Sequence, residues 1–154
     1  MNKGLKLGDQ LPDVSLKNQF GDLVTLEELK GDKAIVVYFY PKDNTPGCTA
    51  EACGFRDQWS EFESIDATVV GISNDSISSH AAFAKQHNLN FTLLSDPKKI
   101  AEQAFGVPRN LFGLVGGRMT FIFDSRGKLI KSFNSAIQIK KHIQEALTSL
   151  KSAS

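Results

Sequence analysis

The fold is decided by residues 34–53, which read AIVVYFYPKDNTPGCTAEAC. The run at 34–40 is an unbroken series of small, β-branched and aromatic residues, which is typical of a strand buried on both faces of a sheet. A turn-rich loop follows at 41–47, and a helix is expected to begin near Cys48. Open α/β sheets bind their ligands at the carboxyl ends of central strands, so the position of Cys48 is informative before any motif is considered.

Strand and helix patterns alternate along the rest of the chain. Periodicity predicts strands at 13–16, 23–26, 68–73, 91–94, 119–123 and 128–133, and helices from Cys48 through Phe62 and at 77–87, 100–105 and 137–150. The first two strands predict an N-terminal β-hairpin. The element order is that of a thioredoxin-like α/β sandwich, in which helices flank a central mixed β-sheet. No linker or composition break interrupts the chain, so we expect residues 1–154 to form one domain.

The composition is that of an ordinary globular protein. Hydrophobic residues make up 41% and charged residues 23% of the 154 residues, which excludes disordered and fibrous classes. The formal net charge of +1 gives no electrostatic reason to expect binding to nucleic acid or to a membrane surface. No apolar run is long enough to cross a bilayer, and the N-terminus lacks a secretory h-region. We expect a cytoplasmic location, with a plastid after removal of a transit peptide as the alternative.

The two cysteines, Cys48 and Cys53, indicate chemistry rather than structure. A chain of this length does not need a disulfide for stability, and a structural disulfide is unusual in a reducing compartment. Two sulfurs alone make a poor zinc site, and the histidines His80, His87 and His142 show no ligand spacing to either of them. We therefore expect no metal and no cofactor, and interpret the pair as reactive.

Residues 45–48 (Thr-Pro-Gly-Cys) have the pattern of a helix start. Thr45 is a suitable N-cap, and Pro46 fits the first helical position, where its missing N–H costs nothing. Cys48 then lies in the first turn, where unpaired N–H groups and the helix dipole favour the thiolate over the thiol. The loop is expected to keep this sulfur near solvent, and the Thr45 hydroxyl could hydrogen-bond whatever the sulfur attacks. The alternative is that Cys48 is a buried, inert small hydrophobe.

The spacing of Cys53 from Cys48 determines what the pair could do. On an intact helix their Cα atoms lie roughly 8–9 Å apart, whereas a disulfide requires less than about 7 Å. A bridge between them therefore requires the first turns of the helix to unwind. Thioredoxin-type reductases use two intervening residues, which close without refolding. The spacing here suits a sulfur that is first oxidised to a sulfenic acid and then condenses with a nearby thiol.

Residues 38–57 resemble the active-site segment of the peroxiredoxins, and more narrowly that of the bacterioferritin comigratory protein or peroxiredoxin Q group. The specific element is the pattern Pro-x-x-x-Thr-x-x-Cys. The resemblance covers nearly the whole chain and continues at 107–108 and 117–121. The stretch 110–113 and the tail 133–150 are most similar to the photosynthetic members of the group.

The resemblance implies a role for five residues. Cys48 would be the peroxidatic cysteine, which attacks the terminal peroxide oxygen and becomes a sulfenic acid. Thr45 would hydrogen-bond the peroxide and the thiolate, while Pro41 would shape the pocket and shield the sulfenic acid. Arg118 would hold the thiolate form, although the residues alone favour an ordinary cation at a strand edge. Cys53 would be the resolving cysteine; the alternative is a core residue, with an external thiol as the resolving group.

The function implied by the resemblance is that of a cofactor-free peroxidase acting on hydrogen peroxide and organic hydroperoxides. Thioredoxin or a similar dithiol protein would recycle a Cys48–Cys53 disulfide, and the lack of a cysteine near the C-terminus favours a monomer. Two other classes stay open, namely a general disulfide oxidoreductase and a redox sensor or binding module that uses the same unwinding helix. Glu51 either pairs with a cation near the site or is a solvated helix carboxylate.

Overall fold

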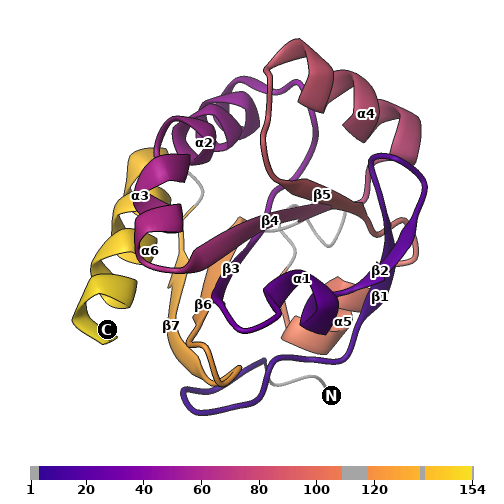
Figure 1. Ribbon diagram of the computed structural model, residues 1–154. Coiled ribbons are helices and arrows are strands. Elements are labelled where there is room, and N and C mark those ends of the chain that lie inside the picture. Colours follow the sequence, from indigo (N-terminus) through magenta and orange to yellow (C-terminus); the bar gives the residue numbers. More distant parts are fainter. Residues whose placement is uncertain (1–3, 109–117, 136–137, 154) are drawn as a thin grey trace.

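The structure, a computed structural model, describes residues 4–108, 118–135 and 138–153. Within these ranges, seven strands form a mixed sheet in the order β2-β1-β5-β4-β3-β6-β7 (Figure 1). The strands are β1 (Ser15–Asn18), β2 (Leu23–Thr25), β3 (Ala34–Phe39), β4 (Ala67–Ser73), β5 (Thr92–Ser95), β6 (Met119–Phe123) and β7 (Leu129–Asn134). Strands β3, β4 and β5 are parallel, and the other neighbouring pairs are antiparallel.

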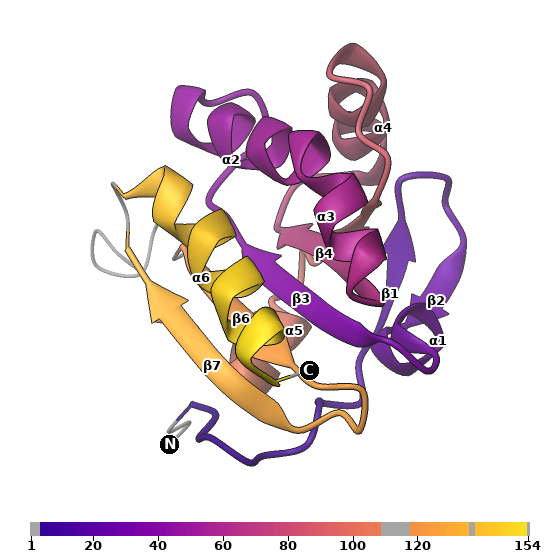
Figure 2. The same ribbon diagram turned by 60° about the vertical axis from the view of Figure 1, so that its left-hand side comes forward.

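Helices cover both faces of this sheet. They are α1 (Leu26–Lys30), α2 (Pro46–Asp57), α3 (Trp59–Ser64), α4 (Ile77–Gln86), α5 (Ile100–Phe105) and α6 (Ile139–Ala153). Helices α2, α3, α4 and α6 lie on one face, and α1 and α5 lie on the other (Figures 1 and 2). The thioredoxin-like sandwich with a mixed central sheet is therefore confirmed. None of the helices in the described ranges is long and apolar enough to cross a bilayer.

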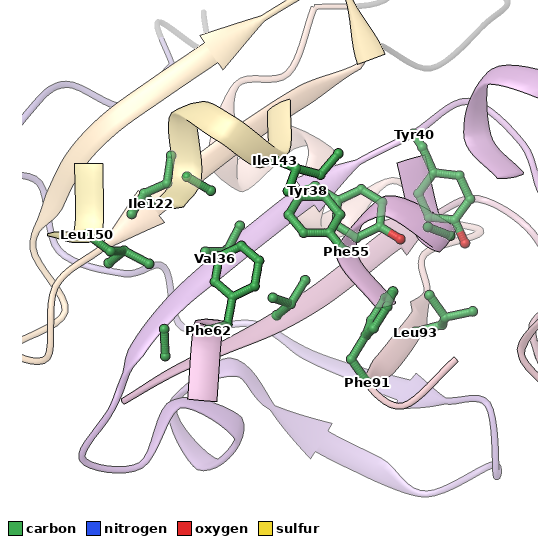
Figure 3. Packing of buried hydrophobic residues seen from close by; sticks show 14 of the residues in the cluster. Val36, Tyr38, Tyr40, Phe55, Phe62, Phe91, Leu93, Ile122, Ile143 and Leu150 are labelled. Atoms are coloured by element: carbon green, nitrogen blue, oxygen red, sulfur yellow. The ribbon is translucent and has the colours of Figure 1, made fainter. Parts of the chain in front are cut away.

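Strand β3 is the centre of the core, and all six of its residues are buried. Successive side chains of a strand point to opposite faces, so the strand contributes to two apolar clusters. Val36, Tyr38 and Tyr40 pack with Phe55 and Ile143 beneath α2 and α6 (Figure 3), and Ile35, Val37 and Phe39 pack beneath α1 and α5. Burying one such side chain contributes about 1.5–3 kcal/mol, so the strand and the loop that leaves its carboxyl end are firmly held.

The N-terminal hairpin is confirmed, but its first strand lies two residues later than the predicted 13–16. The Asn18 side chain accepts hydrogen bonds from the backbone N–H groups of Phe20 and Asp22, and this closes the turn. Lys17 and Asn18 also pair with β5, so β1 continues to residue 18 instead of ending at residue 16. Side-chain capping of a turn and pairing with a distant strand are not visible in an alternation pattern.

The prediction that the second strand continues through residue 26 is wrong, because Leu26 begins α1. Thr25 accepts a hydrogen bond from the backbone N–H of Glu28, and the Glu28 side chain accepts one from the backbone of Thr25. This capping box starts the helix. The helical stretch expected from Cys48 to Phe62 is divided at Gln58 into α2 and α3. The closing helix runs over Ile139–Ala153 and so extends beyond the predicted end at 150, while the predicted start at 137 lies outside the described residues.

Candidate active site

Cys48 lies in the first turn of α2, which begins as the sequence predicts. Thr45 is the N-cap in an extended conformation, and Pro46 is the first helical residue. Because α2 packs on the sheet, Cys48 belongs to the same apolar cluster as Ala52, and only 1% of the residue is exposed. The prediction that the sulfur lies near solvent is therefore wrong, because the loop turns it inward.

Arg118 makes direct contact with this sulfur. Its Nη2 donates a hydrogen bond to Cys48 Sγ at 3.1 Å. The contact follows from the sheet: Met119, the first residue of β6, pairs with Phe39, the last residue of β3, so Arg118 reaches the carboxyl end of β3 where α2 begins. Gly47 leaves room for the guanidinium, since a Cβ there would lie 3.1 Å from Nη2. The sheet thus places a permanent cation on the sulfur.

Glu51 is the second partner of Arg118. It lies three residues after Cys48 and therefore on the same face of α2. Arg118 Nη1 donates to Glu51 Oε1 at 2.5 Å, and Glu51 is 0% exposed, so it pairs with a cation and is not a solvated carboxylate. Burial, opposed by the charge of Arg118, raises the pKa of Glu51 from 4.5 to about 8. Near neutral pH Glu51 is therefore mainly protonated, which leaves the charge of Arg118 to the Cys48 sulfur.

His142 of α6 closes the site behind Glu51, and its role was not predicted from the sequence. Its Nε2 donates to the carbonyl oxygen of Ser135 at 2.8 Å, and its Nδ1 lies 2.7 Å from Thr120 Oγ1 and 3.6 Å from Glu51 Oε2. Burial lowers the pKa of His142, so the ring is neutral and Nδ1 accepts the Thr120 proton. A signal existed, because position 142 shares the apolar face of this helix with Ile139 and Ala146.

The other predicted site residues lie on the same loop and helix. The Thr45 hydroxyl donates to the carbonyl oxygen of Lys42 at 2.9 Å, which fixes the loop but leaves its lone pairs available. Pro41 and Thr45 are half-buried. Cys53 is a half-buried free thiol on the same intact helix as Cys48. The segments 110–113 and Gly117, which carry part of the resemblance, lie outside the described residues.

A sequence model of the AhpC/TSA family matches residues 7–132 of the chain. The chain belongs to this family. Peroxiredoxin Q, chloroplastic, of Gentiana triflora is 48% identical over 146 residues, which cover 95% of this chain and 67% of the relative. The crystal structure of peroxidoxin BcpB from Mycobacterium tuberculosis superposes with a TM-score of 0.91 at 37% identity, over 97% and 99% of the two chains. The bacterioferritin comigratory protein of Xanthomonas campestris gives a TM-score of 0.83 at 29% identity, over 94% of this chain and 99% of that one.

Membership of the peroxiredoxin Q group confirms the resemblance read from residues 38–57. The protein is a thiol-dependent peroxidase, an oxidoreductase that acts on peroxides and is reduced by thiols. Among the described residues of this peroxiredoxin, the side chains that could together hold a metal ion are Asp43, Asp75 and His80. All three side chains already have hydrogen-bond partners within the protein, so they do not require a metal ion.

Proposed function

We propose that this peroxiredoxin reduces hydrogen peroxide and organic hydroperoxides at Cys48, and that Cys53 resolves the sulfenic acid within the same chain. The observation that carries the peroxide step is the 3.1 Å contact between Arg118 Nη2 and Cys48 Sγ. A cation on the sulfur favours the thiolate, which is the nucleophile. The same guanidinium is placed to stabilise the negative charge that develops on the departing oxygen.

In the peroxide step the Cys48 thiolate attacks the terminal oxygen of the peroxide. The S–O bond forms as the O–O bond breaks. The other peroxide oxygen leaves with the electron pair of the O–O bond and takes a proton, giving water or an alcohol. The Thr45 hydroxyl orients the peroxide through its free lone pairs while it donates to Lys42. Pro41, half-buried on the same loop, limits the access of water to the sulfenic acid.

In the resolving step the Cys53 thiol condenses with the sulfenic acid, forming a disulfide and releasing water. Both cysteines lie on α2, so the helix must unwind before the sulfurs can meet. Gly54, next to Cys53, lowers the helix propensity of this segment by about 1 kcal/mol relative to alanine. Unwinding also separates Glu51 from Arg118, so the hydrogen bond from Arg118 to Glu51 is an interaction that the resolving step must break.

A dithiol protein such as thioredoxin then returns two electrons and restores both thiols, which gives ping-pong kinetics. The Xanthomonas campestris protein is described for its alkyl peroxide reduction activity, which supports organic hydroperoxides as substrates here. We also propose that residues 1–154 act as a single domain and as a monomer. The relatives are named chloroplastic, which supports the plastid alternative, and the cytoplasmic location stays a prediction.

The test is rapid mixing of the reduced protein with one equivalent of hydrogen peroxide, followed by quenching and peptide mass spectrometry. We expect fast peroxide consumption and a Cys48–Cys53 linked peptide that thioredoxin reduces. Cys53→Ser should instead accumulate a sulfenic acid that dimedone traps, and Cys48→Ser should consume no peroxide. Consumption at the rate of an ordinary exposed thiol, with insulin disulfide reduction, would favour the oxidoreductase. A slow reaction with a large conformational change would favour the sensor.

A further inference from the structure

The active-site loop is fastened to α4 by the buried carboxylate of Asp43, a residue only 4% exposed. Its Oδ1 accepts a hydrogen bond from the Tyr40 hydroxyl at 2.6 Å. Its Oδ2 accepts one from the Ser79 hydroxyl at 2.8 Å and lies 2.7 Å from His80 Nδ1. The backbone N–H of Asp43 donates to Asp75 Oδ2 at 2.8 Å. Two residues before Thr45, the loop is therefore tied to the end of β3, to the segment before α4 and to α4 itself.

The hydrogen bonds of His80 determine its protonation. The ring is 0% exposed, and its Nε2 lies 3.0 Å from the carbonyl oxygen of Leu94. A carbonyl oxygen only accepts, so Nε2 carries a hydrogen. The Tyr40 and Ser79 hydroxyls both donate to the Asp43 carboxyl, which therefore acts as an ionised acceptor. Burial raises the pKa of Asp43, but its hydrogen bonds with His80, Tyr40 and Ser79 lower it. Nδ1 therefore also carries a hydrogen, and His80 is an imidazolium cation.

The remaining groups around the ring agree with this assignment. The Tyr40 hydroxyl, 3.4 Å from Nδ1, is already the donor to Asp43. The Ser73 hydroxyl, 3.4 Å from Nε2, donates to Asp75 Oδ2 at 2.7 Å. The carboxylate of Asp75 is the other acidic group of this cluster. A metal ion would have to displace these protons from an already satisfied donor set, so the cluster fits an ion pair better than a metal site.

We propose that the Asp43–His80 ion pair positions the active-site loop for the peroxide step, holding Thr45 and the first turn of α2 where Cys48 reacts. Thr45 is separated from Asp43 only by Asn44, which has a left-handed φ of 63°. A displacement of Asp43 is therefore passed directly to Thr45 and the helix start. Misplacement of a reacting group by about 1 Å can cost about 100-fold in rate. The proposal concerns oxidation of Cys48 and does not depend on how the sulfenic acid is resolved.

The experiment uses two neutral replacements of His80 in the full chain. The amide nitrogen of Asn lies near the position of Nδ1, so His80→Asn keeps a donor to Asp43. The amide nitrogen of Gln lies near Nε2, so His80→Gln keeps only the donor to Leu94. For each variant two rates are measured across pH by peptide mass spectrometry: oxidation of Cys48 by hydrogen peroxide, and its alkylation by chloroacetamide. Alkylation requires only the thiolate, whereas the peroxide reaction also requires the positioned loop.

We expect His80→Gln to lower the peroxide rate by at least about tenfold while alkylation changes much less, and His80→Asn to retain more of the peroxide rate. His87→Gln, at the end of the same helix, is the matched control and should change neither rate. The proposal is overturned if both rates of His80→Gln fall equally or if neither falls, since the pair would then be structural only.

Two further measurements keep the proposal testable if His80→Gln does not fold. Ser79→Ala removes a single donor to the Asp43 carboxylate, and it should lower the peroxide rate selectively and by a smaller factor. Nitrogen NMR of the wild-type His80 ring should show hydrogens on both nitrogens at pH 7. A neutral tautomer there would contradict the ion pair.

Discussion

At Cys48 the buried sulfur has a charged neighbour in direct contact, the guanidinium of Arg118. The two residues are 70 positions apart in the chain and 3.1 Å apart in space. Arg118 is itself only 7% exposed, so its charge is weakly screened by solvent. Glu51 orients the guanidinium by accepting a hydrogen bond from its other terminal nitrogen, Nη1. The site therefore combines a buried sulfur with a fixed, buried cation.

Replacing Arg118 tests this arrangement. Arg118→Met should lower the rate of Cys48 oxidation by peroxide by about 10²–10³-fold, the usual effect of removing one positioned donor to a developing negative charge. Arg118→Lys should be intermediate, because it keeps the charge but not the fork that contacts two partners. Stopped-flow measurement with Trp59 fluorescence gives the rates. Arg126→Met, at an exposed turn residue, is the control; equal rates for the two methionine variants would contradict the role of Arg118.

The raised pKa of Glu51 predicts a pH dependence of stability. Between about pH 4.5 and 8 the folded protein keeps a proton on Glu51 that the unfolded chain releases. The free energy of unfolding therefore falls as pH rises through this window, by up to about 1.4 kcal/mol per pH unit. Glu51→Gln removes the titration, so the free energy of unfolding of the variant minus that of the wild type should increase from pH 4.5 to 8.

Urea unfolding at several pH values measures this difference. The same series at higher salt is the control, because a buried group is screened little and the trend should persist. A difference that does not vary with pH would show that Glu51 is ionised throughout the window.

At the scale of the elements, α2 holds both cysteines and must change if they join. In the thiol form it is a continuous helix from Pro46 to Asp57. Its backbone hydrogen bonds over 48–53 cannot survive in a chain whose Cys48 and Cys53 sulfurs are bonded. We therefore expect oxidation to change α2, while α4, which is fastened to the active-site loop through Asp43, stays intact.

Hydrogen exchange followed by mass spectrometry tests this expectation. After one turnover with peroxide, amides of α2 over 48–56 should exchange much faster than in the reduced protein, because their helical hydrogen bonds are lost. Amides of α4 should be unchanged. Cys53→Ser, oxidised in the same way, serves as the control and should keep α2 protected. Equal protection of α2 before and after oxidation would rule out the intramolecular disulfide.

At the scale of the whole molecule, the core beneath α2 contains a buried polar group without a partner in the described part of the chain, the Tyr38 hydroxyl. Tyr38 and Tyr40 leave the same face of β3 and stack on each other (Figure 3). The Tyr40 hydroxyl donates to Asp43, whereas the Tyr38 hydroxyl is buried with no hydrogen-bond partner among the described residues. A buried hydroxyl without a partner costs about 1–3 kcal/mol.

These two tyrosines give a matched pair of substitutions. Tyr38→Phe should raise the free energy of unfolding by about 1 kcal/mol, since it removes the unsatisfied hydroxyl and little volume. Tyr40→Phe should lower it by about 1–2 kcal/mol, since it removes a hydrogen bond to an ionised carboxylate. Urea denaturation of both variants and of the wild type measures these changes in the free energy of unfolding. A loss of stability in Tyr38→Phe would mean that its hydroxyl has a partner in solution.

Much of this molecule is visible in local patterns. The apolar run of β3 and the Thr45-Pro46 helix start depend on neighbours within a few residues, so their position in the chain is predictable. The same holds for the family resemblance, which rests on one short segment. The shifted first strand and the missed helix α1 show where this fails, because side-chain caps at Asn18 and Thr25 overrode the alternation.

The sequence by itself determined the order of the elements apart from α1, the thioredoxin-like class and the identity of the reactive cysteine. The tertiary structure alone decided that Cys48 is buried, that Glu51 is the second partner of Arg118, and that His142 lies beside Glu51. It also brought His80 between a carboxylate 37 positions away and a carbonyl 14 positions away. The physical reason is that helix caps and strand patterns are short-range, whereas burial and ion pairing depend on which strands pair, and that is a property of the folded chain.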